Sequence, residues 1–423
     1  MLIQSNFLQK LSPALLQEDF ASSPDEYCGL IVEMVPGRSM DDLSAIIDSN
    51  RGKIHRETKL IQGVAIRVPV KSIRDLVLSR HVKKIWHDAK VRIKLNVAVP
   101  AVGGLQIQEQ GFTGKDVTVA IIDTGIFPHY DLIRPENRVV GWHDMVKGRT
   151  FPYDDSGHGT HVAGIIAGNG LSSRGKYIGM APDARLVGIK ALDQNGEGTT
   201  SDIISALEWC IENKATYNIK VINLSVGATA QGSCRTDPLC RATSAAWESG
   251  MAVCAAAGND GPGIRTINTP GTNPKIITVG NLDDHRTVGP DDDSLNESSS
   301  RGPTVDNRLK PDLLAPGTRI MSLRNGGGYR ALTGTSMAAP MVTGAIAQML
   351  EKWPSMKPDE LKRTLMKNAR KLNLQSNEQG SGALSLESIF KESSTNQKSI
   401  FNFAQLEKAL PAAMLSLLPL LMA

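Results

Sequence analysis

The sequence predicts an α/β protein in two parts, a small α+β unit of the split βαβ type and then a mainly parallel, doubly wound sheet. A chain of 423 residues is long enough for a full α/β core and a smaller second domain. Up to about Arg92, strand and helix patterns are short and closely spaced. Beyond Gly111, short β-rich runs alternate with longer helical stretches. We expect a leader over 1–26, a first domain over 27–92, a main domain over 93–390, and a linker with an apolar tail over 391–423.

The first domain has the pattern strand, helix, strand, strand, helix, strand. The apolar run Tyr27–Met34 begins it, and Gly63–Val68 is a second clear strand. Lys71–Leu78 has helical spacing, and His81–Trp86 is the closing strand. A unit of this kind is either an independent binding domain or a prosegment, and the sequence after it decides between the two.

The main domain is expected to contain a parallel sheet with helices on both faces. Two helices are indicated, one capped by Ser201 and running through Ile211, the other over Leu239–Ser249. Open α/β folds build their sites at the carboxyl ends of such strands. The expected strands are Val117–Asp123, Arg185–Lys190, Val221–Ser225, Ala252–Ala257 and Lys275–Gly280.

Charge and terminal segments exclude several classes of function. The net charge of +4 arises within residues 1–100, which hold 15 Lys/Arg and 11 Asp/Glu, so nothing favours nucleic-acid binding. The first ten residues lack the features of a secretory signal, which predicts a cytoplasmic protein. The apolar stretch Ala409–Ala423 contains Pro411 and Pro419 and falls short of the ~18 residues of a membrane span. We expect it to be a docking or weakly membrane-attracted tail.

The five cysteines are an odd number without metal-ligand spacing, and we expect them to be mostly reduced. Cys210 and Cys254 lie in apolar stretches and are expected in the core. Cys28 carries no further signal. As an alternative for the remaining pair, Cys234 and Cys240 could close a loop.

Two segments supply a carboxylate and an imidazole. Asp123 ends an expected strand and is followed by Thr124-Gly125, so it either caps a turn or accepts a proton-bearing histidine nitrogen. His158 begins a helix of small residues and is the expected general base. His161 is interpreted as structural because only His158 is at the exposed helix start. The two histidines are three residues apart with no nearby carboxylate of the metalloprotease type, which disfavours a metal pair.

Two further segments complete the chemistry. Ser336 starts a helix that tolerates Pro340 in its first turn, and it is either an N-cap or a nucleophile that needs His158 within hydrogen-bond reach. Helix N-termini favour developing negative charge. Asn259 follows the strand Ala252–Ala257, so its amide could join the N–H of Ser336 in stabilising an oxyanion. By itself, the Gly-Asn-Asp-Gly sequence around Asn259 is only a turn signal.

Together these segments closely resemble the subtilisin family of serine proteases. The matching motifs are Asp-Thr-Gly at Asp123, His-Gly-Thr-His-Val-Ala-Gly from His158, Ala-Ala-Gly-Asn ending at Asn259, and Gly-Thr-Ser-Met-Ala-Ala-Pro around Ser336. The resemblance runs from about Gly111 to Leu386 and implies a subtilisin-like fold. It also implies an Asp123, His158 and Ser336 triad with Asn259 at the oxyanion.

The resemblance also implies how substrate binds and how the enzyme is made. An extended protein or peptide substrate would lie between two edges of backbone. One edge would contain Ser225, Val226 and Gly227 and the other Gly196 and Gly198, while Gly258, Pro270 and Gly271 would wall the primary specificity pocket. Residues 27–92 resemble the inhibitory prosegment, removed by self-cleavage between roughly Trp86 and Val99. The layout, including Tyr153-Asp154-Asp155, is similar to that of intracellular bacterial members.

Calcium is where the sequence departs from the secreted members of that family. The loop Asn169–Ile178 contains Arg174 and Lys176 and does not resemble their calcium-binding loop, so no cofactor is expected to be required. Asp131 and the run Asp291-Asp292-Asp293 remain candidates for cations, although a solvated loop also explains the run.

The predicted activity is that of a serine endopeptidase made as a self-inhibited precursor. The alternatives are a catalytically silent homologue that only binds partners and a narrow-specificity processing protease. Asp123, His158, Asn259 and Ser336 are all residue types that can carry out the proposed chemistry, which disfavours a catalytically silent homologue. The acidic pocket residues expected of a protease selective for basic sites are not evident in the matched motifs.

Overall fold

The computed structural model describes residues 10–12, 15, 25–38, 40–58, 62–87, 97–230 and 232–391. The chain forms two compact units, Met1–Ile93 and Lys94–Ala423, and each is described by itself. Most of the expected leader, the segment 88–96 at the expected cleavage region and the expected tail lie outside the described residues.

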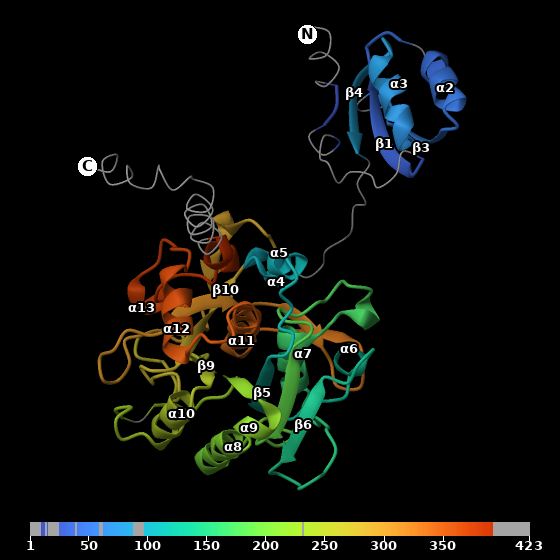
Figure 1. The fold of residues 1–423 in the computed structure, drawn as a ribbon. Helices are drawn as coiled ribbons and strands as arrows, with labels where there is room; N and C mark the ends of the chain where they lie inside the picture. The colour runs from blue at the N-terminus through green and yellow to red at the C-terminus, as the bar shows by residue number, and fades with distance from the viewer. Residues whose placement is uncertain are drawn as a thin grey trace, which may run out of the picture. The chain divides into compact units, whose positions relative to one another are not determined.

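The first unit is a four-stranded antiparallel sheet with two α-helices packed on it (Figure 1). The strand order β2-β3-β1-β4 is the split βαβ arrangement. Its core includes Leu30, Ile66 and Ile85, which have no exposed surface. The elements are β1 (Tyr27–Met34), α2 (Met40–Ser49), β2 (Lys53–Thr58), β3 (Gly63–Pro69), η3 (Val70–Ser72), α3 (Ile73–Leu78) and β4 (Val82–His87).

The second unit contains a mostly parallel sheet of order β11-β10-β9-β8-β5-β7-β6, with β12 also paired to β10. The strand β5 lies between β7 and β8, and later strands continue on both sides of it, so its carboxyl end is a topological switch point. The strands are β5 (Thr118–Asp123), β6 (Val139–Asp144), β7 (Arg185–Lys190), β8 (Ile219–Leu224), β9 (Ala252–Ala256), β10 (Ile277–Asp283), β11 (Ser294–Leu295) and β12 (Leu313–Pro316). The predicted α/β fold class is confirmed.

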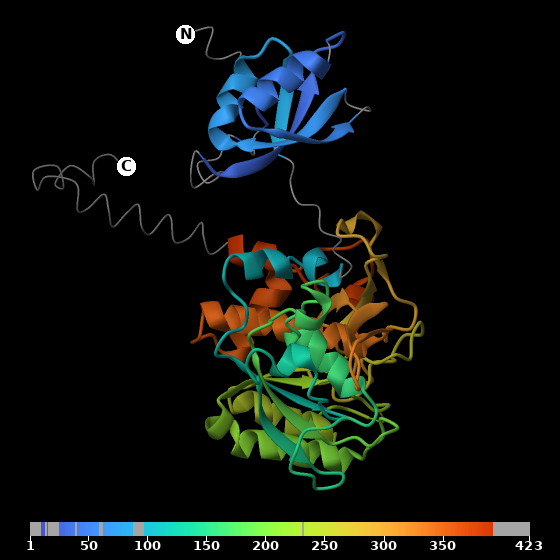
Figure 2. The ribbon, with the colours of Figure 1, turned by 90° about the vertical axis from the view of Figure 1, so that its right-hand side faces the viewer.

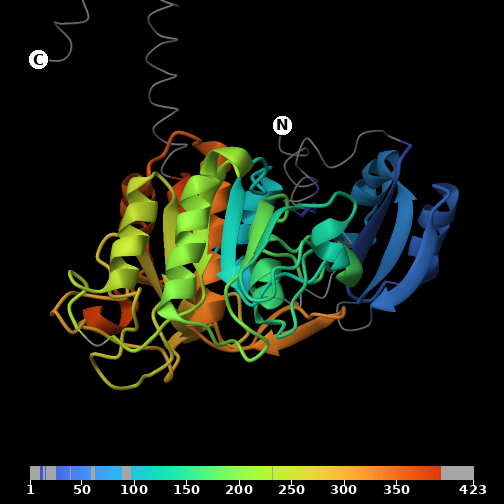
Figure 3. The same ribbon diagram turned by 90° about the horizontal axis from the view of Figure 1, so that it is seen from below.

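Helices cover both faces of this sheet, as Figures 1 and 3 show. On one face α7 (His158–Ala167) packs against α11 (Thr335–Lys352), and on the other α8 (Thr200–Glu212) packs against α10 (Pro238–Glu248). Both α7 and α11 are buried along nearly their whole length, which suits their small and apolar residues. Figure 2 gives a second view of these layers.

The smaller elements surround this core and are mostly ones the sequence did not predict. They are α4 (Ala98–Ala101), α5 (Gly104–Glu109), α6 (Tyr130–Ile133), η4 (Leu171–Ser173), α9 (Lys214–Tyr217), η5 (Pro290–Asp292), β13 (Ile320–Leu323), β14 (Tyr329–Leu332), α12 (Pro358–Lys367) and α13 (Ser376–Gln379).

The predicted cap of α8 is wrong by two residues. The helix is capped by Thr199 and not by Ser201. The Thr199 hydroxyl accepts a hydrogen bond from the Asp202 N–H at 3.2 Å, and the Asp202 carboxylate accepts one from the Thr199 N–H at 2.8 Å. This reciprocal capping box satisfies two free donors, which Ser201 inside the first turn does not do.

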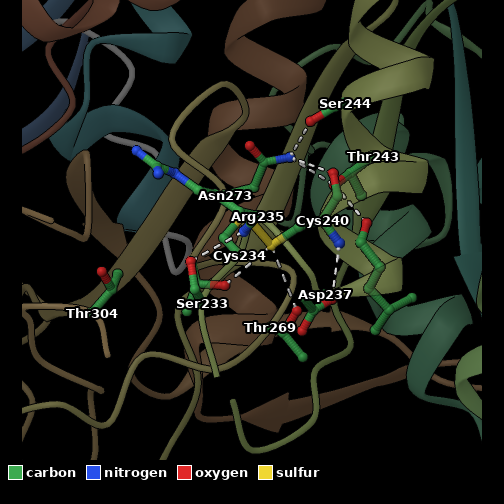
Figure 4. Close-up of a disulfide and its surroundings, with 12 residues drawn as sticks. Ser233, Cys234, Arg235, Asp237, Cys240, Thr243, Ser244, Thr269, Asn273 and Thr304 are labelled. Atoms are coloured by element: carbon green, nitrogen blue, oxygen red, sulfur yellow. Dashed lines mark hydrogen bonds between the residues drawn. A yellow bond between two sulfur atoms is a disulfide. The ribbon is translucent and has the colours of Figure 1, made fainter. Parts of the chain in front are cut away.

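The expectation of mostly reduced cysteines is wrong for one pair, because Cys234 and Cys240 form a disulfide (Figure 4). Cys240 lies in α10, and the turn before that helix returns the chain to within 5.5 Å of the Cys234 Cα. Cys28, Cys210 and Cys254 are free, and the last two are buried in the core as predicted.

Candidate active site

An open cavity of about 780 Å³ lies at the carboxyl ends of the central strands of the second unit. His158, Asn259 and Ser336 line it, together with Thr124, which follows β5. The sheet thus brings together residues that are more than 200 positions apart in the sequence, at the edge where a parallel sheet is expected to build a site.

Asp123 and His158 form a hydrogen-bonded pair at this edge. The His158 Nδ1 to Asp123 Oδ1 distance is 2.8 Å, and the same oxygen accepts the Thr124 N–H at 2.7 Å. Asp123 is fully buried, whereas the His158 side chain is 29% exposed. Burial alone would lower the pKa of His158, but the charge of Asp123 and its hydrogen bond outweigh burial and raise that pKa above its usual value.

Glycines allow His158 to reach this position. Gly157, just before α7, has φ = +90°, a backbone conformation that side chains rarely adopt. A Cβ at Gly159 would lie 2.1 Å from the Gly125 carbonyl oxygen, so only glycine lets the first turn of α7 pack against the end of β5. His158 can therefore bond Asp123 through Nδ1 while it lines the cavity.

Asp154 holds this arrangement from behind, and the sequence interpretation gave it no role. It is buried, and its Oδ1 accepts the Thr124 hydroxyl at 2.9 Å and the Gly157 N–H at 2.7 Å. Its Oδ2 accepts both the N–H and the hydroxyl of Thr160, at 2.9 and 2.6 Å. Asp154 thus ties the end of β5 to the start of α7 on both sides of His158. Its place just before the histidine motif was the only signal in the sequence.

Lys190, at the end of β7, ties together another part of the same edge. Its fully buried Nζ donates to the carbonyl oxygens of Thr124 and Leu192, at 2.7 and 2.9 Å, and to Asp155 Oδ1 at 2.7 Å. Both carbonyls belong to residues that line the cavity. Buried cations are normally paired in this way, and here the pairing fixes two cavity segments to each other.

Ser336 is the second residue of α11, as the sequence predicted for a helix start. Its hydroxyl donates to the Ser225 carbonyl at 3.1 Å, and the Ser225 hydroxyl donates back to the Ser336 carbonyl at 2.9 Å. These bonds attach the start of α11 to the end of β8. Ser336 and His158 line the same cavity, and the hydroxyl is bonded here to Ser225.

Asn259 is oriented by the residue that precedes Ser336. Its Oδ1 accepts the N–H of Thr335 at 2.9 Å and the Thr335 hydroxyl at 3.1 Å. Because Thr335 bonds the oxygen of this planar amide, the NH₂ group at its other end is available on the side of the cavity that Asn259 lines. An N–H donor and the N-terminus of α11 therefore lie beside the Ser336 hydroxyl, an arrangement suited to negative charge.

His161 occupies a different environment from His158. It is fully buried, and its Nε2 lies 3.0 Å from the Ile320 carbonyl oxygen and 3.1 Å from that of Arg330. Burial lowers the pKa of His161 to about 3, so the ring is neutral and Nε2 carries the proton it shares with these carbonyls. These contacts attach α7 to the β13 and β14 hairpin.

Most of the predicted substrate-binding residues line the cavity, and two do not. Those that line it are Ser225, Val226, Gly227, Gly196, Gly198 and Gly258. Pro270 and Gly271 are buried behind the wall, where a Cβ at Gly271 would lie 3.0 Å from the Ala256 carbonyl oxygen. Asn268, which the sequence interpretation did not name, lines the cavity in their place.

Asp131 and Asp293, two of the residues proposed for cations, have protein partners. Asp131 accepts the Tyr329 hydroxyl at 2.6 Å through Oδ2 and the Ser172 N–H at 2.8 Å through Oδ1. Asp293 pairs with Arg370. Calcium takes six to eight oxygen ligands, and the described ranges contain no group of three or more His, Cys, Asp or Glu that could hold a metal. These donor sets do not fit a calcium site.

Within the same described ranges, no helix combines the length and apolar character that crossing a bilayer requires.

Comparison with known proteins agrees with this geometry. Residues 114–382 match the subtilase family of peptidases, S8. The chain is 44% identical over 309 residues to serine protease AprX of Bacillus subtilis, covering 68% of this chain and 69% of that protein. It is 34% identical over 316 residues to subtilisin E of the same species, covering 73% and 76%.

A solved structure shows the same fold. The crystal structure of a cold-adapted subtilisin-like serine proteinase matches with a TM-score of 0.52 and 31% identity, covering 65% of this chain and 90% of that one. Sequence, fold and family match together show that this chain belongs to the subtilase family and is a serine endopeptidase.

Proposed function

We propose that Asp123, His158 and Ser336 are the catalytic triad and that Asn259 and the Ser336 N–H form the oxyanion hole. The observation that carries this proposal is the 2.8 Å bond between Asp123 and His158 beside a cavity that Ser336 and Asn259 also line. A carboxylate accepts hydrogen bonds, so this bond places the proton of the neutral imidazole on Nδ1 and leaves Nε2 unprotonated, which is the tautomer a general base needs.

The reaction follows from these positions. The Ser336 hydroxyl turns from Ser225 toward His158 Nε2, which takes its proton as Oγ attacks the substrate carbonyl carbon. Asn259 and the Ser336 N–H stabilise the resulting oxyanion. His158 then gives its proton to the departing amine, leaving an acyl-enzyme on Ser336. Water then attacks the acyl-enzyme by the same steps, with His158 as base, and releases the carboxylic acid product and free Ser336. Asp123 stays ionised throughout.

Protein substrates would bind as an extended strand between the two backbone edges of the cavity. Ser225, Val226 and Gly227 supply one edge and Gly196 and Gly198 the other. Recognition through main-chain hydrogen bonds tolerates many sequences.

The first unit is proposed to be an inhibitory prosegment that the enzyme removes itself, by cleavage between roughly Trp86 and Val99. Its split βαβ topology and its position before the peptidase unit support this role. The basic balance of residues 1–100 is consistent with it.

The intact mass of the purified wild type beside that of Ser336→Ala, after incubation at neutral pH, tests the proposal. The wild type should lose about 90 N-terminal residues, while Ser336→Ala stays at full length; that count follows from the proposed cleavage region. Equal masses would refute self-processing. A peptide-hydrolysis assay on the same two samples separates that failure from failure of the triad.

A cytoplasmic location is also proposed, and the disulfide gives it a test. The cytosol keeps thiols reduced, so a cytoplasmic location requires that the Cys234 and Cys240 disulfide of the structure be reduced in the cell. Alkylation during rapid lysis should then label both cysteines. An intact disulfide in freshly lysed cells would contradict a cytoplasmic location.

A further inference from the structure

Arg330 lies beside His158 and outside the cavity. It belongs to β14, and its guanidinium packs on Gly157, the residue that precedes His158. A Cβ at Gly157 would lie 3.0 Å from Arg330 Nη2 and 2.4 Å from Asn325 Oδ1. Neither Arg330 nor Asn325 lines the cavity. The hairpin of β13 and β14 therefore places a cation next to the proposed base, at a position that the cavity does not include.

The main chain of Arg330 is fixed at this position. Its carbonyl oxygen lies 3.1 Å from His161 Nε2, and the residue is paired with Ser322 across the hairpin. The Ser322 hydroxyl donates to the His161 carbonyl at 2.7 Å, and Asn325 Nδ2 donates to the Asp154 carbonyl at 3.2 Å. Because none of these bonds uses the guanidinium, the Arg330 side chain can be replaced while the hairpin stays attached to α7.

The Arg330 guanidinium has no carboxylate partner in the described part of the chain. Arg319, just before the same hairpin, pairs with Asp283 at 3.5 Å, whereas no ion pair among the described residues includes Arg330. Arg330 is half-buried, and its Nε is buried without a hydrogen bond to any described residue. A guanidinium partly withdrawn from water is normally paired, and its planar fork fits a carboxylate through two parallel hydrogen bonds. This position therefore suits a carboxylate that a ligand supplies.

The charge of Arg330 is opposite to that of the cavity. The described residues that line the cavity include Glu197 and Asp260 and no Lys or Arg. Besides burial and the neighbouring carboxylates, the charge of Arg330 acts on His158 and lowers the pKa of that histidine, as a nearby cation does. A ligand carboxylate is therefore disfavoured within the cavity and favoured beside Arg330.

The path of the substrate leads past this cation. In the proposed reaction, the part of the substrate that precedes the scissile bond fills the cavity, and His158 gives its proton to the amine of the part that leaves. The residues after the scissile bond therefore extend from Ser336 past His158 and out of the cavity. β14 ends at Leu332, and the chain continues directly into the start of α11. The hairpin thus adjoins both reacting residues, and the first residues of the leaving peptide come within reach of Arg330.

We propose that Arg330 selects substrates with an acidic side chain at one of the first two positions after the scissile bond. An Asp or Glu carboxylate there gives the guanidinium the partner that the described chain does not supply. Asparagine or glutamine of the same shape offers only a neutral acceptor, which makes a weaker hydrogen bond to a cation. This inference rests on the proposed function of the cavity and of His158.

Peptides that differ only in Glu against Gln test the inference, at the first and then at the second position after the scissile bond. The peptides are amidated at the C-terminus, which removes the terminal carboxylate, and mass spectrometry identifies the bond that is cut. The wild type should show a kcat/KM about tenfold higher for Glu at one of the two positions. Moving the same pair to the second position before the bond places it in the acidic cavity and should remove this gain.

Two arginine variants of the same hairpin identify the residue responsible. Arg330→Met keeps an apolar stem but removes the charge, and it should bring the ratio of Glu to Gln close to one. Arg324→Met makes the same change at an exposed arginine and should keep the wild-type ratio. Ratios near one at both positions in the wild type, a ratio that survives Arg330→Met, or an equal loss in Arg324→Met would overturn the inference.

Failure of the inference and failure of the proposed function are distinguishable. If no peptide is hydrolysed, the proposed function fails separately, and the same ratios are read from the peptide dissociation constants of Ser336→Ala. A far-UV spectrum and a melting curve for Arg330→Met confirm that the variant is folded, and Arg330→Gln replaces it if it is not.

Discussion

The first and second turns of α7 place two histidines three residues apart in opposite environments. His158 is partly exposed, bonds the buried Asp123, and has a raised pKa. His161 is buried, bonds two backbone carbonyls, and has a pKa lowered to about 3. The same side chain on the same helix is thus suited to exchange protons in one place and to hold a hairpin in the other. The partner and the access to solvent decide its chemistry, not the residue type.

The largest effect is expected from removing the exposed member of this pair. His158→Ala deprives Ser336 of its base and should lower kcat by about 10⁴-fold or more, with an almost unchanged melting temperature. Steady-state kinetics and a thermal melt measure both. His143→Ala is the control, because His143 stacks on Trp209 and does not line the cavity. Equal losses of kcat in His158→Ala and His143→Ala would contradict the assignment of His158 as the general base.

The oxyanion donor should follow in size. Asn259→Leu removes the NH₂ group while the N-terminus of α11 remains, so kcat should fall by about 10²–10³-fold with little change in KM. Thr335→Val is the comparison, because the Thr335 hydroxyl orients Asn259 and accepts the Gly258 N–H at 3.2 Å but is not an oxyanion donor in this proposal. That variant should lose far less. If Asn259→Leu changed KM but not kcat, Asn259 would have no role in stabilising the transition state.

A smaller loss is expected from the residue that positions His158. Asp154→Asn replaces one carboxylate oxygen by an NH₂ group. Whichever oxygen is replaced, the NH₂ group then faces groups that donate to Asp154 in the wild type, either those of Thr160 or those of Gly157 and Thr124. The start of α7 should shift, and displacement of a reacting group by about 1 Å costs up to ~10²-fold in rate. We expect kcat to fall by ten- to a hundredfold while KM is nearly constant. Wild-type kcat in Asp154→Asn would exclude a positioning role.

The buried member of the pair should affect stability instead of rate. His161→Leu leaves the Ile320 and Arg330 carbonyls without their donor, and should lower the free energy of unfolding by about 2–4 kcal/mol. kcat should change far less than in His158→Ala. Urea unfolding measures the loss. His161→Gln, whose amide can donate to a carbonyl, should recover part of it.

His161 also makes stability depend on pH with a definite sign. Its folded pKa of about 3 lies below the unfolded value of ~6.5, so between these values the unfolded chain binds the extra proton. Stability is therefore complete above pH ~6.5 and declines as the pH falls toward 3. His161→Leu should show a shallower decline than the wild type over that window, and an equal slope would contradict the burial of a neutral ring.

The smallest change is expected at Asp131, away from the reaction. Tyr329→Phe removes the hydroxyl that bonds Asp131 Oδ2 and should cost about 1–3 kcal/mol of stability. Adding EDTA to the wild type should not reproduce this loss, because protein donors already occupy this carboxylate. Thermal melts with and without chelator compare the two. A chelator-sensitive melt that calcium restores would show that a metal is bound elsewhere.

The sequence singled out the residues proposed to react but not the residues that support them. Asp123, His158, Asn259 and Ser336 stand in motifs at strand ends and helix starts, where the spacing itself indicates a shared edge. Asp154 and Lys190 each bond Thr124, which is distant from both in the sequence, and single positions carry no periodic pattern for such contacts. Nothing in the spacing of Pro270 and Gly271 distinguished the cavity wall from the layer behind it.

Local structure shows the same division. Strands such as β7, Arg185–Lys190, have clear apolar runs and were predicted with their bounds. β6, Val139–Asp144, mixes buried and exposed positions without regular alternation and was not predicted. The Cys234 and Cys240 disulfide depends on a turn that the cysteine count does not indicate.

The rate at which a fluorophosphonate adds to Ser336 tests the central claim most directly, because it requires the activated hydroxyl without requiring a particular peptide. In the wild type, one adduct should form at Ser336, and the rate should fall as the pH drops through the raised pKa of His158. His158→Ala should remove nearly all of the reaction and His161→Gln should not. An adduct at another residue, or an equal rate in His158→Ala, would contradict the account.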